Sequence, residues 1–284
     1  LPVAGFGTRV LPATKSIPKE MLPVFDRPAI QYVVDEARAA GIEHFIFITG
    51  RNKHAIEDYF DIAYELEEAL QAKGKVDILE DVRACSLPPG TASFVRQQRA
   101  LGLGHAVLCA KDIVANEPFA VLLPDVLINA EKSCLAQMMD AYNETGGNVI
   151  AVDEVPMERV HKYGVIRPAD GVSQEDKTIR MTGMVEKPPR EEAPSNLKIT
   201  GRYILQPEIF DLLESQGAGA GGEIQLTDSM ERLMQSQDFY AVKFASGFDD
   251  VGVLGFTNGG VQVKQLGELQ EKPDRKSTRL NSSH

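Results

Sequence analysis

Cysteine is scarce in this sequence. Its three copies, Cys85, Cys109 and Cys134, lie far apart and form no CxxC pair. Disulfide frameworks and zinc sites need more numerous or more closely spaced cysteines. The scarcity therefore predicts reduced, structural thiols, a cytoplasmic location and no zinc site.

Long apolar runs are also missing. No stretch of eighteen apolar residues occurs, although 43% of the 284 residues are hydrophobic. Because a membrane-spanning helix needs about 20 such residues, no segment is expected to cross a bilayer. No signal peptide is recognisable, and the sequence begins at Leu1 in mid-pattern, which we interpret as a fragment whose native amino terminus is not given.

A basic excess is absent as well. Thirty Lys and Arg residues face forty-one Asp and Glu residues, which gives a net charge of -11. A surface that coats nucleic acid needs the opposite balance, so no nucleic-acid partner is expected. A phosphate ligand is not excluded, because a few converging cations suffice to bind it.

Alternating apolar and amphipathic segments dominate the first half of the chain. Strands are predicted at 1–5, 44–49, 76–79, 93–97 and 119–128, with a further strand at 148–155. Helices are predicted at 27–41, 53–74, 104–114 and 134–146. This order predicts an α/β fold with a Rossmann-like, mostly parallel (mixed) central sheet and helices on both faces. Ligands of such sheets bind at the carboxyl ends of the strands.

The second half has a different texture. Short β segments at 162–168, 181–188 and 197–205 are separated by polar loops, and a helix is predicted at 222–235 with Thr227 as its cap. We interpret this half as a smaller β-rich, substrate-side lobe.

One domain is expected over residues 1–272, with halves 1–150 and 151–272. The last ten residues contain one apolar side chain, so 273–284 is predicted to be a disordered tail, with an artefact of the sequence as the alternative.

A glycine turn follows the first strand. Gly5 and Gly7 allow backbone N–H groups to approach an anion, and Arg9 and Lys19 add positive charge, a combination that suits a polyphosphate. The alternative is an ordinary tight turn with surface cations. The segment matches neither GxGxxG nor a P-loop.

Two acidic residues, one at a strand end and one in a turn, are candidate metal ligands. Asp125 ends the most apolar strand, where a carboxylate is costly unless it is paired or bound to metal, and Mg²⁺ prefers such oxygen ligands. Asp250, two residues before Gly252, is a candidate second ligand. The alternatives are a helix cap for Asp125 and a solvated turn for Asp250.

Three other polar side chains could contact a substrate. The Gln97 amide both donates and accepts, which suits the edge of a uracil, whereas His105 is more often structural at a helix start. Glu186 and Lys187 are neighbours in an extended segment, so one of them is expected to point inward. The alternative is an exposed strand end.

The ordered set of these segments resembles one protein family. "GFGTRVLPATKSIPKEMLPV", "GLGHAVLCA", "LLPDV", "YGVI", "VEKP", "APSNLKITGRYIL" and "GEIQLTD" resemble the bacterial UTP–glucose-1-phosphate uridylyltransferases, within the sugar nucleotidyltransferase superfamily. The resemblance covers roughly residues 1 to 252.

The resemblance implies a role for each matching residue. The nucleotide loop would contain Ala4, Gly5, Gly7, Thr8 and Glu20, and uracil would be read by Gln97 and Gly102. Glucose would be lined by Gly164, Glu186 and Ile199, and Lys187 would bind the sugar phosphate. The catalytic set would be Arg9, Lys19, Lys187 and Asp125, and Mg²⁺ would bind Asp125 and Asp250. The segment after Asp250 is shorter than in the family, and this departure leaves Asp249 as the alternative second ligand.

The implied activity is Mg²⁺-dependent, in-line transfer of a uridylyl group from UTP to glucose 1-phosphate by a cytoplasmic homo-oligomer, a dimer or tetramer. Two related alternatives are a catalytically silent relative that binds nucleotide sugars and a dTTP-using enzyme. A dinucleotide-dependent oxidoreductase would require the third glycine that this turn lacks.

Overall fold

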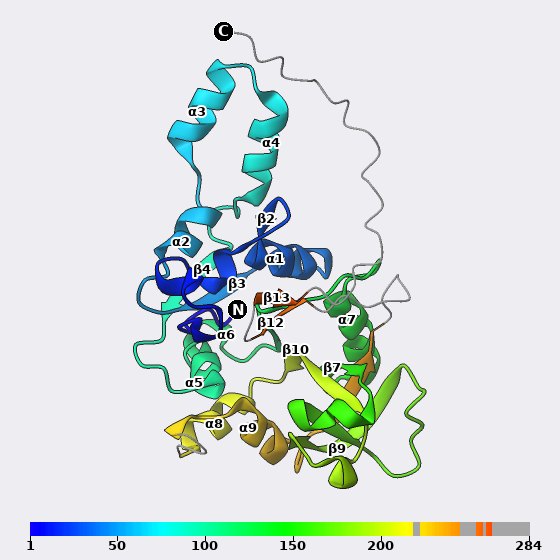
Figure 1. The fold of residues 1–284 in the computed structure, drawn as a ribbon. Coiled ribbons are helices and arrows are strands. Elements are labelled where there is room, and N and C mark those ends of the chain that lie inside the picture. Colours follow the sequence, from blue (N-terminus) through cyan, green and yellow to red (C-terminus); the bar gives the residue numbers. More distant parts are fainter. Residues whose placement is uncertain (218–221, 245–253, 258–259, 263–284) are drawn as a thin grey trace.

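The computed structural model describes residues 1–217, 222–244, 254–257 and 260–262, which form a mixed α/β fold (Figure 1). Its helices are α1 (Ala29–Ala39), α2 (His54–Phe60), α3 (Tyr64–Ala72), α4 (Val76–Cys85), α5 (Leu103–Leu108), α6 (Lys111–Val114), α7 (Cys134–Thr145), α8 (Ile209–Ser215) and α9 (Leu226–Leu233). Its strands are β1 (Pro23–Val24), β2 (Arg27–Pro28), β3 (Phe45–Thr49), β4 (Ala92–Arg96), β5 (Phe119–Leu122), β6 (Val126–Leu127), β7 (Asn148–Glu154), β8 (Gly164–Pro168), β9 (Thr178–Glu186), β10 (Leu197–Leu205), β11 (Phe239–Lys243), β12 (Leu254–Thr257) and β13 (Gly260–Gln262). No helix among these residues is long and apolar enough to cross a membrane.

The main sheet has six strands in the order β5-β10-β7-β11-β9-β8, and a further pairing joins β10 to β8. Among the described strands of this sheet, only β11 and β7 run parallel; the other described pairs are antiparallel. A second, two-stranded sheet pairs β3 with β4 in parallel. The mixed α/β class is confirmed, but parallel pairing is less common than the alternation of strands and helices predicted.

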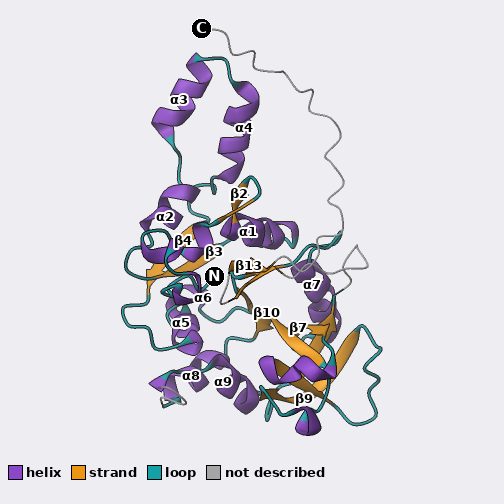
Figure 2. Ribbon diagram, in the orientation of Figure 1, coloured by secondary structure: helices purple, strands orange, loops and turns teal. Residues whose placement is uncertain are grey.

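Both faces of the main sheet are buried. Along β7, Val149 and Ala151 pack into one core with α1 and α7, whereas Ile150 and Val152 pack into another with α8 and α9. Alternate residues of a strand face opposite sides, so a strand covered on both sides must be apolar throughout. Figure 2 shows the corresponding arrangement of helices around the strands.

Some of the predicted helices and strands differ from the structure. The helix predicted at 53–74 is interrupted at 61–63, where Asp61 is extended, and the strand predicted at 76–79 is the start of α4. The helix predicted at 104–114 is divided into α5 and α6. Thr227 lies inside α9, whose cap is Gln225.

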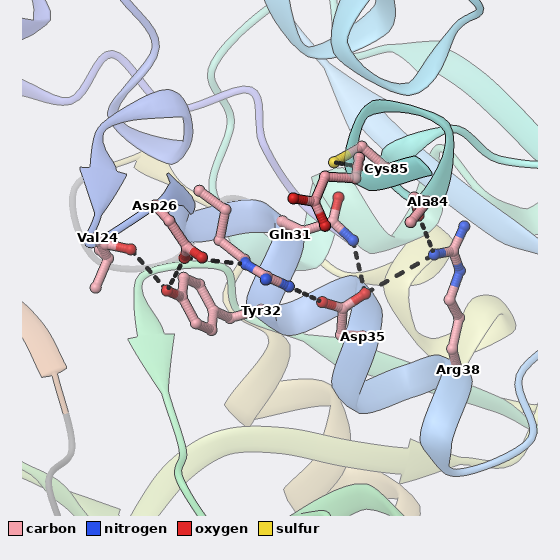
Figure 3. A network of polar contacts seen from close by, with 10 residues as sticks. Val24, Asp26, Gln31, Tyr32, Asp35, Arg38, Ala84 and Cys85 are labelled. Atoms are coloured by element: carbon pink, nitrogen blue, oxygen red, sulfur yellow. Dashed lines mark hydrogen bonds and ion pairs between the residues drawn. The ribbon is translucent and has the colours of Figure 1, made fainter. Parts of the chain in front are cut away.

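The helices α3 and α4 form a hairpin that projects from the rest of the fold (Figure 1). At its base, Arg38 of α1 donates to the carbonyl oxygens of Ala84 and Ser86 at 3.2 and 2.8 Å. Figure 3 shows how Asp35, which accepts from Gln31 at 2.6 Å, also lies beside Arg38. This polar network fixes the end of α4 on α1.

Candidate active site

The glycine turn is open to solvent. Gly7 has φ 66°, and its carbonyl oxygen accepts from the Thr14 hydroxyl at 2.7 Å. Thr8 and Arg9 follow in a short 3-10 helix and are exposed, as is Gly5, whereas Ala4 is half-buried. The turn therefore leaves its backbone accessible, although Arg9 makes no ion pair within the described part of the chain.

Lys19 and Asp125 meet across 106 positions of sequence. The Lys19 Nζ donates to Asp125 Oδ2 at 2.9 Å, and the two side chains are 20% and 30% exposed. Lys19 begins a 3-10 helix, and Asp125 lies in the turn between β5 and β6. The structure thus brings together a cation and a carboxylate that the sequence predicts as partners in one site.

Glu20, the next residue, is deeply buried. Its Oε2 accepts from Lys53 Nζ at 2.8 Å, and its side chain is 1% exposed. Its Oε1 has no partner among the described residues. Lys53, just before α2, is a neighbour that no local sequence pattern indicated.

Gln97 is held in one orientation. Its amide nitrogen lies 3.1 Å from the Gly102 carbonyl oxygen and 2.9 Å from His105 Nδ1. A carbonyl oxygen only accepts, so the amide must donate to Gly102 with one hydrogen and to His105 with the other. The Gln97 carbonyl oxygen remains as an acceptor.

Gly102 occupies a position where a side chain would not fit. Its φ is 95°, and a Cβ there would lie 2.8 Å from the Ile224 carbonyl oxygen. Hydrogen bonds from Ile224 N to Leu101 O and from Gly104 N to Ile224 O, at 2.7 and 2.8 Å, join this loop to the segment before α9.

The three residues predicted to line a sugar share one cavity. Gly164 of β8, Glu186 of β9 and Ile199 of β10 border a space of about 250 Å³. A Cβ at Gly164 would lie 2.8 Å from Glu186 Oε2, so only glycine leaves this carboxylate its place. The α9 residues that complete the wall are Thr227, Asp228 and Glu231.

Sequence reasoning missed these α9 residues. The positions of Thr227, Asp228 and Glu231 put them on the polar side of an amphipathic helix, where residues three and four apart are neighbours. Burial and then the charge of Asp228 raise the pKa of Glu231. The polar side of "LTDSMERL" was the available signal.

Lys187 departs from the extended geometry predicted for "VEKP". Its φ is 49°, which breaks the alternation after β9, and its Nζ lies 2.9 Å from Glu186 Oε1. Both side chains are exposed, so the expectation that one of the pair points inward on the opposite face is wrong. The exposed ammonium is available to an anion beside the cavity.

Tyr203 lies within electrostatic reach of both the Lys19–Asp125 pair and the Glu186 side chain. This buried β10 residue has a raised pKa, mainly through burial, and the negative charges of Glu186 and Asp125 raise it further. Both carboxylates therefore lie within electrostatic reach of one hydroxyl.

Asp250 and Asp249 lie outside the described residues, as does the tail at 273–284. Among the described residues no group of three or more His, Cys, Asp and Glu side chains forms a metal centre. Asp125 is thus the predicted metal ligand that the structure places. A larger cavity of about 540 Å³, next to Phe45 and Phe119, contains none of the predicted site residues.

Comparison with known proteins gives consistent matches. The nucleotidyl transferase family model matches residues 3–255. A UTP–glucose-1-phosphate uridylyltransferase of Staphylococcus epidermidis is 51% identical over 263 residues, which cover 92% of this chain and 90% of the relative. The enzyme of the same name from Bacillus subtilis is 49% identical, with 90% of this chain and 87% of the relative covered.

Solved structures agree with these relatives. A UTP-bound UGPase from Acinetobacter baumannii has a TM-score of 0.79 and 46% identity, and 86% of this chain and 84% of that one are covered. A UDP-glucose pyrophosphorylase complexed with UDP-glucose has a TM-score of 0.73 and 43% identity, with 86% and 88% covered.

Proposed function

The chain belongs to the nucleotidyl transferase family, and on that premise we propose that it transfers a uridylyl group from UTP to glucose 1-phosphate. The products are UDP-glucose and pyrophosphate. The observation that carries the proposal is about half identity to enzymes of this activity over nine tenths of the chain. The Lys19–Asp125 contact and the cavity beside Glu186 support it.

The reaction joins two anions. A phosphate oxygen of glucose 1-phosphate attacks the α-phosphorus of UTP in line, the bond from that phosphorus to the bridging oxygen breaks, and pyrophosphate leaves with the electron pair. Charge repulsion is the main obstacle, so positioning and neutralisation supply the catalysis. Arg9 and Lys19 would face the triphosphate, and Lys187 would hold the sugar phosphate.

No general base is required. The second pKa of a phosphate monoester is about 6, so the attacking group is already a dianion near neutral pH. The proposed catalytic set accordingly consists of cations and one metal-binding carboxylate.

The donor set suits Mg²⁺. This ion keeps water and phosphate ligands and takes one or two carboxylates from a protein. Asp125 would supply one, and Asp250 is proposed as the other. Bound Mg²⁺ would neutralise phosphate charge. Lys19 Nζ donates to Asp125 Oδ2 in this structure. With metal and nucleotide bound, this lysine would instead donate to a phosphate oxygen.

Base selection follows from the fixed Gln97 amide. Its carbonyl oxygen, the acceptor left over, matches the N3–H of uracil and opposes the N3 lone pair of cytosine. Glu186 would accept from sugar hydroxyls in the neighbouring cavity.

A homo-oligomer and a cytoplasmic location are part of the proposal. Five exposed apolar residues on and beside the projecting α3–α4 hairpin support association, because a partner subunit would remove their apolar surface from water; they are Ile62, Tyr64, Leu66, Val76 and Ile78. The three free cysteines support a reducing compartment. Light scattering of the purified protein would test the oligomer.

A pyrophosphate-release assay tests the function. The protein would be given UTP, dTTP, CTP or ATP with glucose 1-phosphate or galactose 1-phosphate, with and without Mg²⁺. We expect the highest kcat/KM with UTP and glucose 1-phosphate, and no turnover after chelation. If no combination of nucleotide and sugar phosphate releases pyrophosphate, the protein is a catalytically silent relative. A preference for dTTP would indicate a thymidylyl-transferring enzyme.

A further inference from the structure

Arg202 is a charged residue at the centre of the fold. It lies in β10, its exposed fraction is 0%, and the proposed mechanism does not use it. An isolated buried charge is very costly, so its partners must account for its presence.

The first partner is a carboxylate on α1. Glu36 accepts from Arg202 Nη2 at 2.7 Å and from Nε at 3.1 Å, and it is 6% exposed. Its Oε1 also accepts from Leu135 N at the start of α7, at 3.2 Å. Glu36 therefore fixes the plane of the guanidinium and ties it to two helices.

The other partners are backbone carbonyls around Asp125. Arg202 Nη1 donates to Leu123 O at 3.0 Å, and Nη2 donates to Val126 O at 2.8 Å. These two residues enclose Pro124 and Asp125, so the guanidinium holds both ends of the turn that carries the carboxylate. A weaker contact to Gly201 O at 3.3 Å completes the set.

The strand is shaped for this contact. The pairing of β10 with β7 shifts register between Ile199 and Tyr203. Gly201 within the shift has φ 71°, and a Cβ there would lie 3.0 Å from the Leu123 side chain. Such irregularities redirect side chains next to active sites, and this one brings Arg202 against the turn.

We propose that Arg202, oriented by Glu36, is a positioning residue that holds the Asp125 turn in the geometry needed to bind the divalent cation. This inference rests on the proposed function, because it takes Asp125 as a metal ligand. A lysine in place of Arg202 would keep the charge opposite Glu36 but could not donate to both carbonyls in the same plane.

The test is a double-mutant cycle of Arg202→Lys and Asp125→Asn. The readout is Mn²⁺ binding, measured by electron paramagnetic resonance in the presence of UDP-glucose and corrected with a protein-free titration. Thr200→Val is the matched control, since Thr200 is a buried β10 neighbour that donates to Ala151 O at 2.9 Å, away from the turn. Unfolding curves of all variants give the accompanying losses of stability.

We expect Arg202→Lys to raise the Kd for Mn²⁺ on the order of tenfold, the scale for losing a group that orients a metal ligand. Thr200→Val should stay within about twofold. In the Asp125→Asn background, Arg202→Lys should add nothing, because its effect passes through Asp125.

Additive effects, or an unchanged Kd in Arg202→Lys, would overturn the inference while leaving the function intact. An unchanged Kd in Asp125→Asn would instead remove the metal role of Asp125 and the inference with it. If Arg202→Lys does not fold, Glu36→Gln takes its place in the cycle. It keeps the side-chain volume and removes the charge that orients Arg202, and the same two results decide.

Discussion

At the scale of single residues, the candidate site contains groups with an unusual backbone conformation. Lys187 adopts φ 49° and Gly102 φ 95°. A left-handed residue other than glycine is strained, and we propose that this conformation at Lys187 directs its ammonium toward the sugar phosphate.

Removing the Lys187 ammonium should slow the reaction. Lys187→Ala is expected to lower kcat about 10²- to 10³-fold, the scale for one pre-placed charge-stabilising group. Steady-state kinetics with saturating UTP measures it. Lys162→Ala is the control, because Lys162 is an exposed lysine outside the cavity. If the kcat of Lys187→Ala lies within a few-fold of the control's kcat, Lys187 does not contribute to catalysis.

Base discrimination should weaken without Gln97. Gln97→Ala is expected to reduce the ratio of kcat/KM for UTP over CTP by about three- to tenfold, the range for one neutral hydrogen bond. Gln98→Ala, its exposed neighbour, should keep the original ratio. An unaltered ratio in Gln97→Ala would count against the assignment.

Sugar binding should suffer when Gly164 gains a side chain. In Gly164→Ala, the new Cβ would lie only 2.8 Å from Glu186 Oε2 and would therefore displace this carboxylate. We expect a several-fold higher KM for glucose 1-phosphate and an unchanged KM for UTP. Gly183→Ala on the same hairpin, with no atom nearer than 3.8 Å, should leave both values alone.

At the scale of elements, local pattern predicted most helices and strands of the first half. It failed where a short apolar run fits either element, as in "VDIL", which begins α4. It failed again at residues 61–63, where the helix stops without glycine or proline. Such breaks depend on packing, which the local pattern does not contain.

The candidate site, like the fold, could be predicted from the sequence only in part. Asp125 was recognisable because a lone acid follows an apolar run, and the structure pairs it with Lys19. The Arg202–Glu36 pair was not, since its partners are 166 positions apart. The segment that contains Arg202 is part of the family resemblance, but the resemblance implies no role for this residue.

The buried ion pair between Lys53 and Glu20 should stabilise the junction of α2 with the 3-10 helix Lys19–Met21. Lys53→Met would leave Glu20 buried and unpaired, which costs about 3–5 kcal/mol of unfolding free energy. Urea denaturation of the ligand-free protein measures this. The double variant with Glu20→Gln should recover part of the loss, and equal stability of Lys53→Met and the unmodified protein would contradict the role of the pair.

At the scale of the whole molecule, one mixed sheet joins the two halves. The strands β5 and β7 begin before residue 150, yet both pair with β10. Asp125 follows β5, and Ile199 lies in β10, which pairs with β5, so the Asp125 turn and the cavity beside Glu186 are carried by strands of one sheet. We propose that this continuity lets one framework orient both substrates.

The most direct test follows an oxygen label through the reaction. Glucose 1-phosphate with ¹⁸O in its nonbridging phosphate oxygens would be converted with unlabelled UTP, and both products analysed by mass spectrometry. If the sugar phosphate attacks the α-phosphorus, all the label appears in UDP-glucose and none in an equal amount of pyrophosphate. Label in the pyrophosphate, or no UDP-glucose from a protein that binds both substrates, would contradict the account.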